Sequence, residues 1–167
     1  MKRVMIIGQP GAGKSTLAGK LGEKTGLPVV YLDKIHWMPG WVERPLKEKI
    51  LMIRAEEEKP LWIIEGGLSA TWDTRLARAD TLVWIDVGLL RRVWRVLARS
   101  WRYRGQSRPD LTEGCPEQFN RETLSFLWFI LRTWRPGKRR METVFARFEG
   151  QKKRLTGTAD TDAWLGS

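Results

Sequence analysis

The sequence predicts an α/β fold in which a parallel sheet is flanked by helices, and two observations carry that prediction. Short apolar runs alternate with stretches of helical periodicity along the 167 residues, which is the pattern of βαβ units. Residues 8–15 also match the spacing G-x-x-x-x-G-K-S, directly after an apolar run and directly before a helix-like stretch. The two observations agree, because a loop of this kind joins a strand to a helix.

Each expected strand is a short run bounded by glycine, proline or an acidic residue, and the runs lie at residues 2–7, 27–32, 61–64, 81–85 and 153–156. The first four runs are mostly apolar, as in parallel strands that are buried on both faces. The last run is basic, and we assign it as a short strand from its place near the end of the chain. Together they predict five strands.

The expected helices show apolar residues at intervals of three and four, and they lie at residues 17–26, 45–59, 71–79, 89–104, 117–134, 138–151 and 160–165. Gly26 and Pro45 supply a stop signal and a start signal. Residues 34–44 are expected to form a loop with a turn at Pro39. Residues 134–137, which include a proline and a glycine, are expected to separate two helices.

Residues 8–15 have the composition of a phosphate-binding loop. Glycines let consecutive backbone N–H groups turn onto phosphate oxygens, the Lys14 ammonium reaches the outer phosphates, and the Ser15 hydroxyl can bind Mg²⁺. The positive end of the following helix adds to the attraction. The candidate nucleotide-binding residues are Gly8, Gly11, Ala12, Gly13, Lys14, Ser15 and Thr16. The alternative is a glycine-rich turn that binds no ligand. Such a turn would require neither a strand before it nor a helix after it, whereas the sequence predicts both here.

Three of the expected strands end in an acidic residue, namely Asp33, Glu65 and Asp86. Ligands of open α/β sheets bind beyond the carboxyl ends of the strands, so each acid is a candidate to orient a water bound to Mg²⁺. Asp33 can also accept a proton from an acceptor hydroxyl. Two structural alternatives stay open, because Asp33 can be a helix cap or turn residue and Asp86 can cap the helix that follows it.

Residues 89–104 are expected to form a helix with one basic face. At 100° per residue its arginines fall within an arc of roughly 100°, and they are Arg91, Arg92, Arg95, Arg99 and Arg102. The opposite side is apolar and consists of Leu90, Val93, Trp94, Leu97 and Trp101. The helix leads into a turn-rich segment, residues 105–116, which we expect to be a mobile loop. A movable loop with arginines can close over phosphates and neutralise charge, whereas the alternative is a solvated basic face.

Composition limits the classes of protein and partner. The net charge of +11 favours either a site for polyanionic small molecules or a surface for nucleic acid. Most of the ten tryptophans lie beside aliphatic residues, and we interpret Trp62, Trp84, Trp94 and Trp128 as core. A single cysteine, Cys115, excludes an internal disulfide and a four-cysteine zinc site. We expect one domain over residues 1–167, no membrane partner, a cytosolic location, and a monomer or dimer.

With these parts in place, the chain resembles the P-loop kinases of the adenylate kinase and shikimate kinase type. It is more closely similar to the bacterial FlaR-type DNA topology modulation proteins, which share that fold. The segments that carry the resemblance are residues 8–15, 32–33, 37–41, 63–66, 79–80, 103–105, 108–110 and 114–117. Where these relatives have Asp-Gly-Asn-Tyr-Ser after the third strand, this chain has Glu-Gly-Gly-Leu-Ser at residues 65–69.

The resemblance implies a three-layer αβα fold with a five-stranded parallel sheet in the order 2-3-1-4-5. It also implies ATP on the phosphate-binding loop, Mg²⁺ at Ser15 and Glu65, and a helical lid around residues 102–117. Arg104 and Arg108 would be lid arginines, Lys14 would hold the phosphates, and Asp33 would face the phosphoryl acceptor.

Two functions follow as hypotheses. The first is a kinase that transfers the γ-phosphoryl group of ATP to a small acceptor, which can be a nucleotide. The second is a nucleic-acid-associated ATPase or regulator whose basic helices contact a DNA backbone. We favour the first, because the arginines cluster near the presumed ATP site and the sequence shows no helix-turn-helix or zinc-finger pattern.

Overall fold

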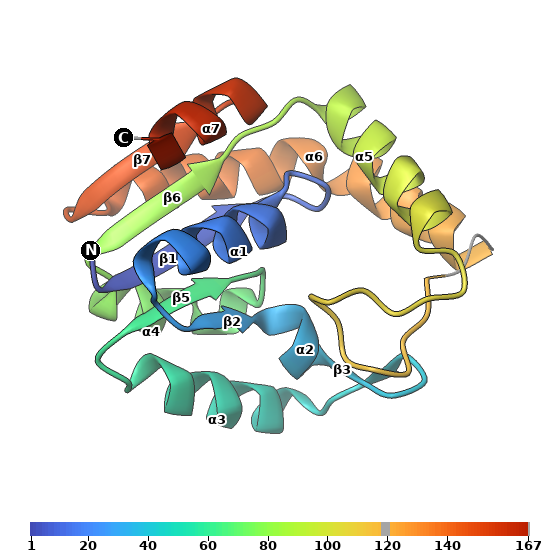
Figure 1. Cartoon of the computed structure of the whole chain (residues 1–167), viewed down its shortest axis with the longest axis horizontal. Helices are drawn as coiled ribbons and strands as arrows, with labels where there is room; N and C mark the ends of the chain where they lie inside the picture. Colours follow the sequence, from blue (N-terminus) through green and yellow to red (C-terminus); the bar gives the residue numbers. More distant parts are fainter. Residues whose placement is uncertain (118–120, 167) are drawn as a thin grey trace.

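The computed structural model describes residues 1–117 and 121–166. Its main sheet contains five parallel strands in the order β2-β5-β1-β6-β7 (Figure 1). The strands are β1 (Arg3–Gly8), β2 (Val29–Tyr31), β5 (Trp62–Glu65), β6 (Thr81–Ile85) and β7 (Gln151–Leu155). Counted along the chain, this is the order 2-3-1-4-5, so the predicted fold class is confirmed. The basic last strand is also confirmed and is longer than expected.

Helices cover both faces of this sheet (Figure 1). Their bounds are α1 (Lys14–Thr25), α2 (Leu32–His36), α3 (Leu46–Glu57), α4 (Trp72–Arg78), α5 (Leu89–Arg102), α6 (Arg121–Arg147) and α7 (Thr158–Gly166). A 3-10 turn at Ser69–Thr71 precedes α4. Helices α1 and α7 pack on one face, while α2, α3, α4 and α6 pack on the other. No helix in the described part of the chain is both long and apolar enough to cross a membrane.

The core explains why the strands are apolar throughout. In β1, Val4 and Ile6 face the cluster under α1, whereas Met5 and Ile7 face the cluster under α4 and α6. Successive side chains of a strand point to opposite faces, so a strand covered on both sides needs apolar residues at every position. Trp62 and Trp84 are buried in this core, as predicted.

The segment at residues 34–44 is more regular than the expected loop. Helix α2 begins at Leu32, and Asp33 lies in its first turn rather than at the end of a longer strand. A small antiparallel hairpin follows, made of β3 (Trp37–Met38) and β4 (Val42–Glu43). The turn prediction at Pro39 was correct, since Gly40 has a φ of 78° and Trp41 a φ of 61°.

Helix α6 is continuous through Pro136, so the predicted break at residues 134–137 was wrong. Proline lacks the N–H that would bond to the preceding turn, which weakens a helix at this point. The Gln9 side chain contacts this part of the helix, because its Nε2 donates to the carbonyls of Thr133 (3.1 Å) and Trp134 (2.9 Å). Gly137 permits this approach, since a Cβ there would lie 2.6 Å from Gln9 Nε2.

Helix α5 turns Arg92, Arg95 and Arg99 toward the protein, while Arg91 and Arg102 are exposed, and this reverses the expectation from its apolar face. Arg92 is 1% exposed, whereas Trp94 is 69% and Trp101 70% exposed. Trp128 on α6 is 66% exposed as well, so the prediction that Trp94 and Trp128 belong to the core was wrong. Arg92 and Arg95 face inward because they contact the loop at residues 8–15.

Candidate active site

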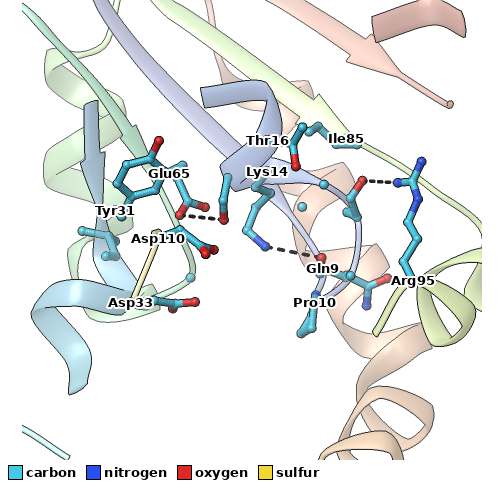
Figure 2. A pocket seen from close by; sticks show the side chains of 18 of the residues that line it. Gln9, Pro10, Lys14, Thr16, Tyr31, Asp33, Glu65, Ile85, Arg95 and Asp110 are labelled. Carbon is cyan, nitrogen blue, oxygen red and sulfur yellow. Dashed lines mark hydrogen bonds between the residues drawn. The ribbon is translucent and has the colours of Figure 1, made fainter. Parts of the chain in front are cut away.

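A cavity of about 1530 Å³ opens at the carboxyl ends of β1, β2 and β5. The segments that line it include the loop at residues 8–15, the start of α2, the turn after β5, and the inward side of α5 (Figure 2). Parallel strands present their carboxyl ends at one edge, so these segments meet although they lie far apart in the sequence.

The loop at residues 8–15 leaves β1 and wraps over the start of α1. Gly11 has a φ of 76° and Gly13 a φ of 102°, a backbone region that glycine enters without strain. Lys14 bends back over the loop, with its Nζ 3.4 Å from the carbonyl oxygen of Gln9 (Figure 2). All seven candidate nucleotide-binding residues line the cavity.

Glu65 lies at the end of β5, with an exposed fraction of 2%, and faces the start of α1. The Ser15 hydroxyl donates to its Oε1 at 3.2 Å. Burial raises the pKa of Glu65 to about 7, while the charge of Lys14 opposes that shift and the charge of Asp33 adds to it. The Glu65 carboxyl therefore changes its charge near neutral pH.

Asp33 and Asp110 approach the same region from α2 and from the segment after α5 (Figure 2). The structure thus brings Lys14, Ser15, Asp33 and Glu65 to one cavity. Asp86 is not among the lining residues, and its carboxylate instead pairs with Arg154 and with Lys138, the latter at 3.5 Å.

In residues 1–117 and 121–166, no group of three His, Cys, Asp or Glu side chains is arranged to hold a metal ion. Mg²⁺ at nucleotide sites takes only one or two protein oxygens, and phosphates and waters supply the remaining ligands. The 3.2 Å pair of Ser15 and Glu65 beside Lys14 fits that requirement. Ser15 and Glu65 are therefore the residues here that could hold a magnesium ion beside a nucleotide.

Two arginines of α5 contact the outside of the loop. Arg95 Nη1 donates to the carbonyl oxygen of Ala12 at 2.7 Å, and Arg92 Nη1 donates to that of Pro10 at 3.4 Å. The sequence placed both residues on the basic face but did not identify Arg95 as a site residue. The signal available in the sequence was that Arg92 and Arg95 lie about one helical turn apart on the same arc of the helix.

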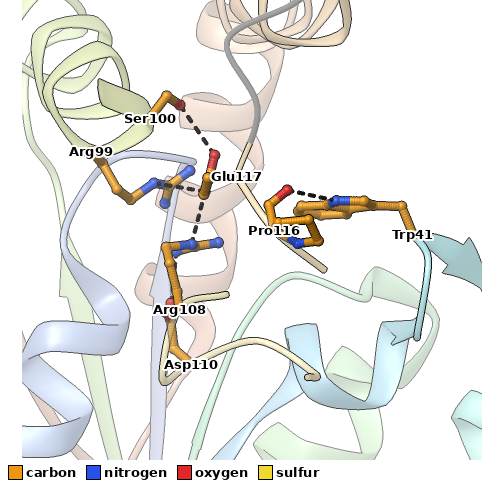
Figure 3. Close-up of polar contacts among 7 residues, drawn as sticks. All are labelled: Trp41, Arg99, Ser100, Arg108, Asp110, Pro116 and Glu117. Carbon is orange, nitrogen blue, oxygen red and sulfur yellow. Dashed lines mark hydrogen bonds and ion pairs between the residues drawn. The ribbon is translucent and has the colours of Figure 1, made fainter. Parts of the chain in front are cut away.

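The connection segment (residues 103–117) carries the two predicted lid arginines to different places. Arg108 is buried and lines the cavity, with its Nε 2.8 Å from Glu117 Oε1 and its Nη1 2.9 Å from Asp110 Oδ2 (Figure 3). Arg104 is exposed and is not among the lining residues. Arg99 also lines the cavity, and sequence reasoning had not identified this residue or Glu117 as part of the site.

The connection segment lies against the β3–β4 hairpin. The Trp41 indole donates to the carbonyl oxygen of Pro116 at 3.0 Å (Figure 3). The Thr112 hydroxyl donates to the carbonyl oxygen of Trp37 at 2.7 Å. The buried Cys115 thiol donates to the Met38 carbonyl oxygen at 3.3 Å, in keeping with a structural role. One wall of the cavity is therefore built jointly by two segments that are distant in sequence.

The strand order, together with the glycine-rich loop at residues 8–15 between β1 and α1, is that of a P-loop kinase-like fold. A solved structure with this fold is shikimate kinase from Bacteroides thetaiotaomicron, which matches with a TM-score of 0.59 and 19% identity. The match covers 99% of this chain and 94% of the shikimate kinase chain. No protein-family model matches the chain, and no curated protein matches it. These results show the fold, and the more specific FlaR-type similarity stays a prediction.

Proposed function

We propose that this protein is an ATP-dependent phosphotransferase that moves the γ-phosphoryl group of ATP to a small acceptor. The observation that carries the proposal is the convergence of Lys14, the Ser15–Glu65 pair and Asp33 on one cavity. That cavity continues past the loop to Trp37 and Trp41, which leaves room for a second molecule. The shikimate kinase fold supports the same class of reaction.

The donor half consists of residues 8–16. The loop amides and Lys14 hold the β- and γ-phosphates, and Ser15 and Glu65 would hold Mg²⁺ directly or through water. Bound Mg²⁺ would supply charge neutralisation at the phosphate oxygens. Glu65 would perform this role as a carboxylate, the form that the charge of Lys14 and a bound cation both favour against burial.

The acceptor half lies between Asp33, the β3–β4 hairpin and the connection segment. An acceptor oxygen forms a bond to the γ-phosphorus as the bond to the β–γ bridging oxygen breaks, and ADP leaves. When the acceptor is an alcohol, its proton passes to the Asp33 carboxylate. Residues 102–117 act as the lid of a single domain, with Arg108 rather than Arg104 at the phosphates.

A test of the proposal is a coupled assay of ADP formation with nucleosides, nucleoside monophosphates and small alcohols as acceptors. We expect at least one acceptor to raise ADP formation well above the basal rate, and Lys14→Ala to abolish that increase. The absence of acceptor-dependent ADP formation across all three classes would overturn the proposal.

The structure offers less support for a nucleic-acid-associated ATPase. The alternative relied on basic helices that are free to contact a DNA backbone, whereas Arg92, Arg95 and Arg99 of α5 face the loop and the cavity wall. An arginine side chain held against its own protein is not available to neutralise a DNA phosphate.

A further inference from the structure

Glu117 is a buried carboxylate that lies between two guanidinium groups. Its Oε1 is 2.8 Å from Arg108 Nε and 3.5 Å from Arg99 Nε, and its Oε2 accepts from the Ser100 hydroxyl at 3.2 Å (Figure 3). Only 7% of the residue is exposed. One carboxylate therefore joins the last turns of α5 to the connection segment.

The two arginines repel each other and are both partly removed from water. Burial lowers the pKa of the Arg99 guanidinium, the nearby charge of Arg108 lowers it further, and the Glu117 carboxylate opposes both effects. Buried like charges are costly unless a counter-charge lies within reach. Glu117 is the counter-charge that the two guanidiniums share, while Asp110 contacts Arg108 alone, at 2.9 Å.

Each guanidinium carries more donors than the Nε that faces Glu117. An arginine presents five N–H donors in one plane, four of them on its two Nη atoms. Both Arg99 and Arg108 line the cavity. Guanidinium N–H groups in the wall of a cavity suit the oxygens of an anionic ligand, and a phosphate chain provides several.

The backbone holds Glu117 in place independently of its side chain. Its N–H donates to the Gln106 carbonyl oxygen at 3.0 Å, and its own carbonyl oxygen accepts from the Gly105 N–H at 2.8 Å. The preceding carbonyl, that of Pro116, accepts from the Trp41 indole. The carboxylate is thus a fixed point to which the flexible arginines are held.

We propose that Glu117 is a positioning residue that holds Arg99 and Arg108 side by side in the cavity wall, where their guanidiniums receive the phosphate chain of the nucleotide. The inference rests on the proposed function, because it assumes that a nucleotide occupies the cavity. Glu117 itself touches no substrate. It acts through the two arginines.

The test compares Glu117→Gln, which keeps the shape and removes the charge, with Glu149→Gln, an exposed residue between α6 and β7 that does not line the cavity. Affinity for a Mg²⁺-bound, non-hydrolysable ATP analogue is measured by calorimetry, and kcat and KM for ATP are measured separately. We expect the Glu117 variant to bind the analogue about tenfold more weakly and to lose kcat as well, since misplaced charges cost catalysis. The Glu149 variant should match the wild type.

Two further variants keep the inference testable if Glu117→Gln folds poorly. Glu117→Asp retains the charge and should restore part of the affinity, while Ser100→Ala removes the donor to Oε2 and should weaken binding by about threefold. If the folded Glu117→Gln protein binds the analogue with the affinity of the wild type, the positioning role is overturned, while the proposed function is not. Increased activity of that variant also overturns it, because Glu117 would then restrain the arginines. A wild type that binds no analogue overturns the proposed function instead.

Discussion

Glu65 is the residue whose charge depends most directly on its surroundings. Its side chain is buried at the end of β5, and burial raises its pKa from 4.5 to about 7. Between these two pH values the folded protein retains a proton that the unfolded chain has lost. Stability therefore falls as pH rises through this window, because the folded state binds more protons there.

We expect Glu65→Gln to remove this part of the pH dependence. The wild type should lose on the order of 2 kcal/mol of unfolding free energy between about pH 5 and pH 7.5 relative to the variant. Urea unfolding of both proteins at a series of pH values measures the difference. Parallel stability profiles for the two proteins would show that Glu65 titrates normally.

Gly11 is a second residue whose role follows from geometry. It adopts a φ of 76°, and a Cβ at this position would lie 2.6 Å from the Arg92 carbonyl oxygen. Gly11→Ala should therefore cost about 1 to 3 kcal/mol in unfolding free energy and weaken nucleotide binding. Gly88→Ala is the matched control, since a Cβ there meets nothing within 4 Å. Equal stability of the two variants in thermal unfolding would contradict the close contact between the loop and α5.

At the scale of elements, α5 shows what amphipathicity can and cannot predict. The helical periodicity of residues 89–104 correctly separated an arginine side from an apolar side, but it did not predict which side faces the protein. The inward side is decided by long-range contacts, such as Arg95 with the Ala12 carbonyl oxygen. Helix α6 is also contacted by a distant residue, because the Gln9 side chain, more than a hundred residues away, donates to two of its carbonyls near Pro136.

The exposed side of α5 leads to a prediction about stability. Trp101 is 70% exposed, so Trp101→Gln should change the unfolding free energy by less than about 1 kcal/mol. Trp84 is 2% exposed, and Trp84→Ala should cost about 3 to 5 kcal/mol. Chemical denaturation of both variants provides the measurement. A large loss for Trp101→Gln would mean that this tryptophan is covered in solution.

For the molecule as a whole, local sequence patterns predicted most of the architecture. The apolar runs predicted four strands of the sheet, the basic fifth strand was assigned from its place near the end of the chain, and the glycine-rich spacing predicted residues 8–16 of the candidate site. The strand order came from the resemblance to P-loop kinases. Arg99 and Glu117 could not be predicted, because their pairing depends on how the connection segment folds back toward α5 and rests on the β3–β4 hairpin.

The net charge of +11 should make the stability of the molecule depend on salt. Raising NaCl from about 50 to 300 mM screens repulsion between like charges and should raise Tm. ATP with Mg²⁺ at matched ionic strength should raise Tm by about 5 °C more, because a ligand that binds only the folded state stabilises it. Lys14→Ala should keep the salt effect and lose the additional shift. A variant that keeps both would contradict the assigned nucleotide site.

The central claim is that this site moves the γ-phosphoryl group of ATP to a small molecule. The most direct measurement follows the label of γ-³²P-ATP after incubation of the protein with Mg²⁺ and a protein-free metabolite extract. The proposal predicts label in a new organic phosphate with the wild type and none with Lys14→Ala. Label that stays in ATP, or appears only as inorganic phosphate, would contradict the claim.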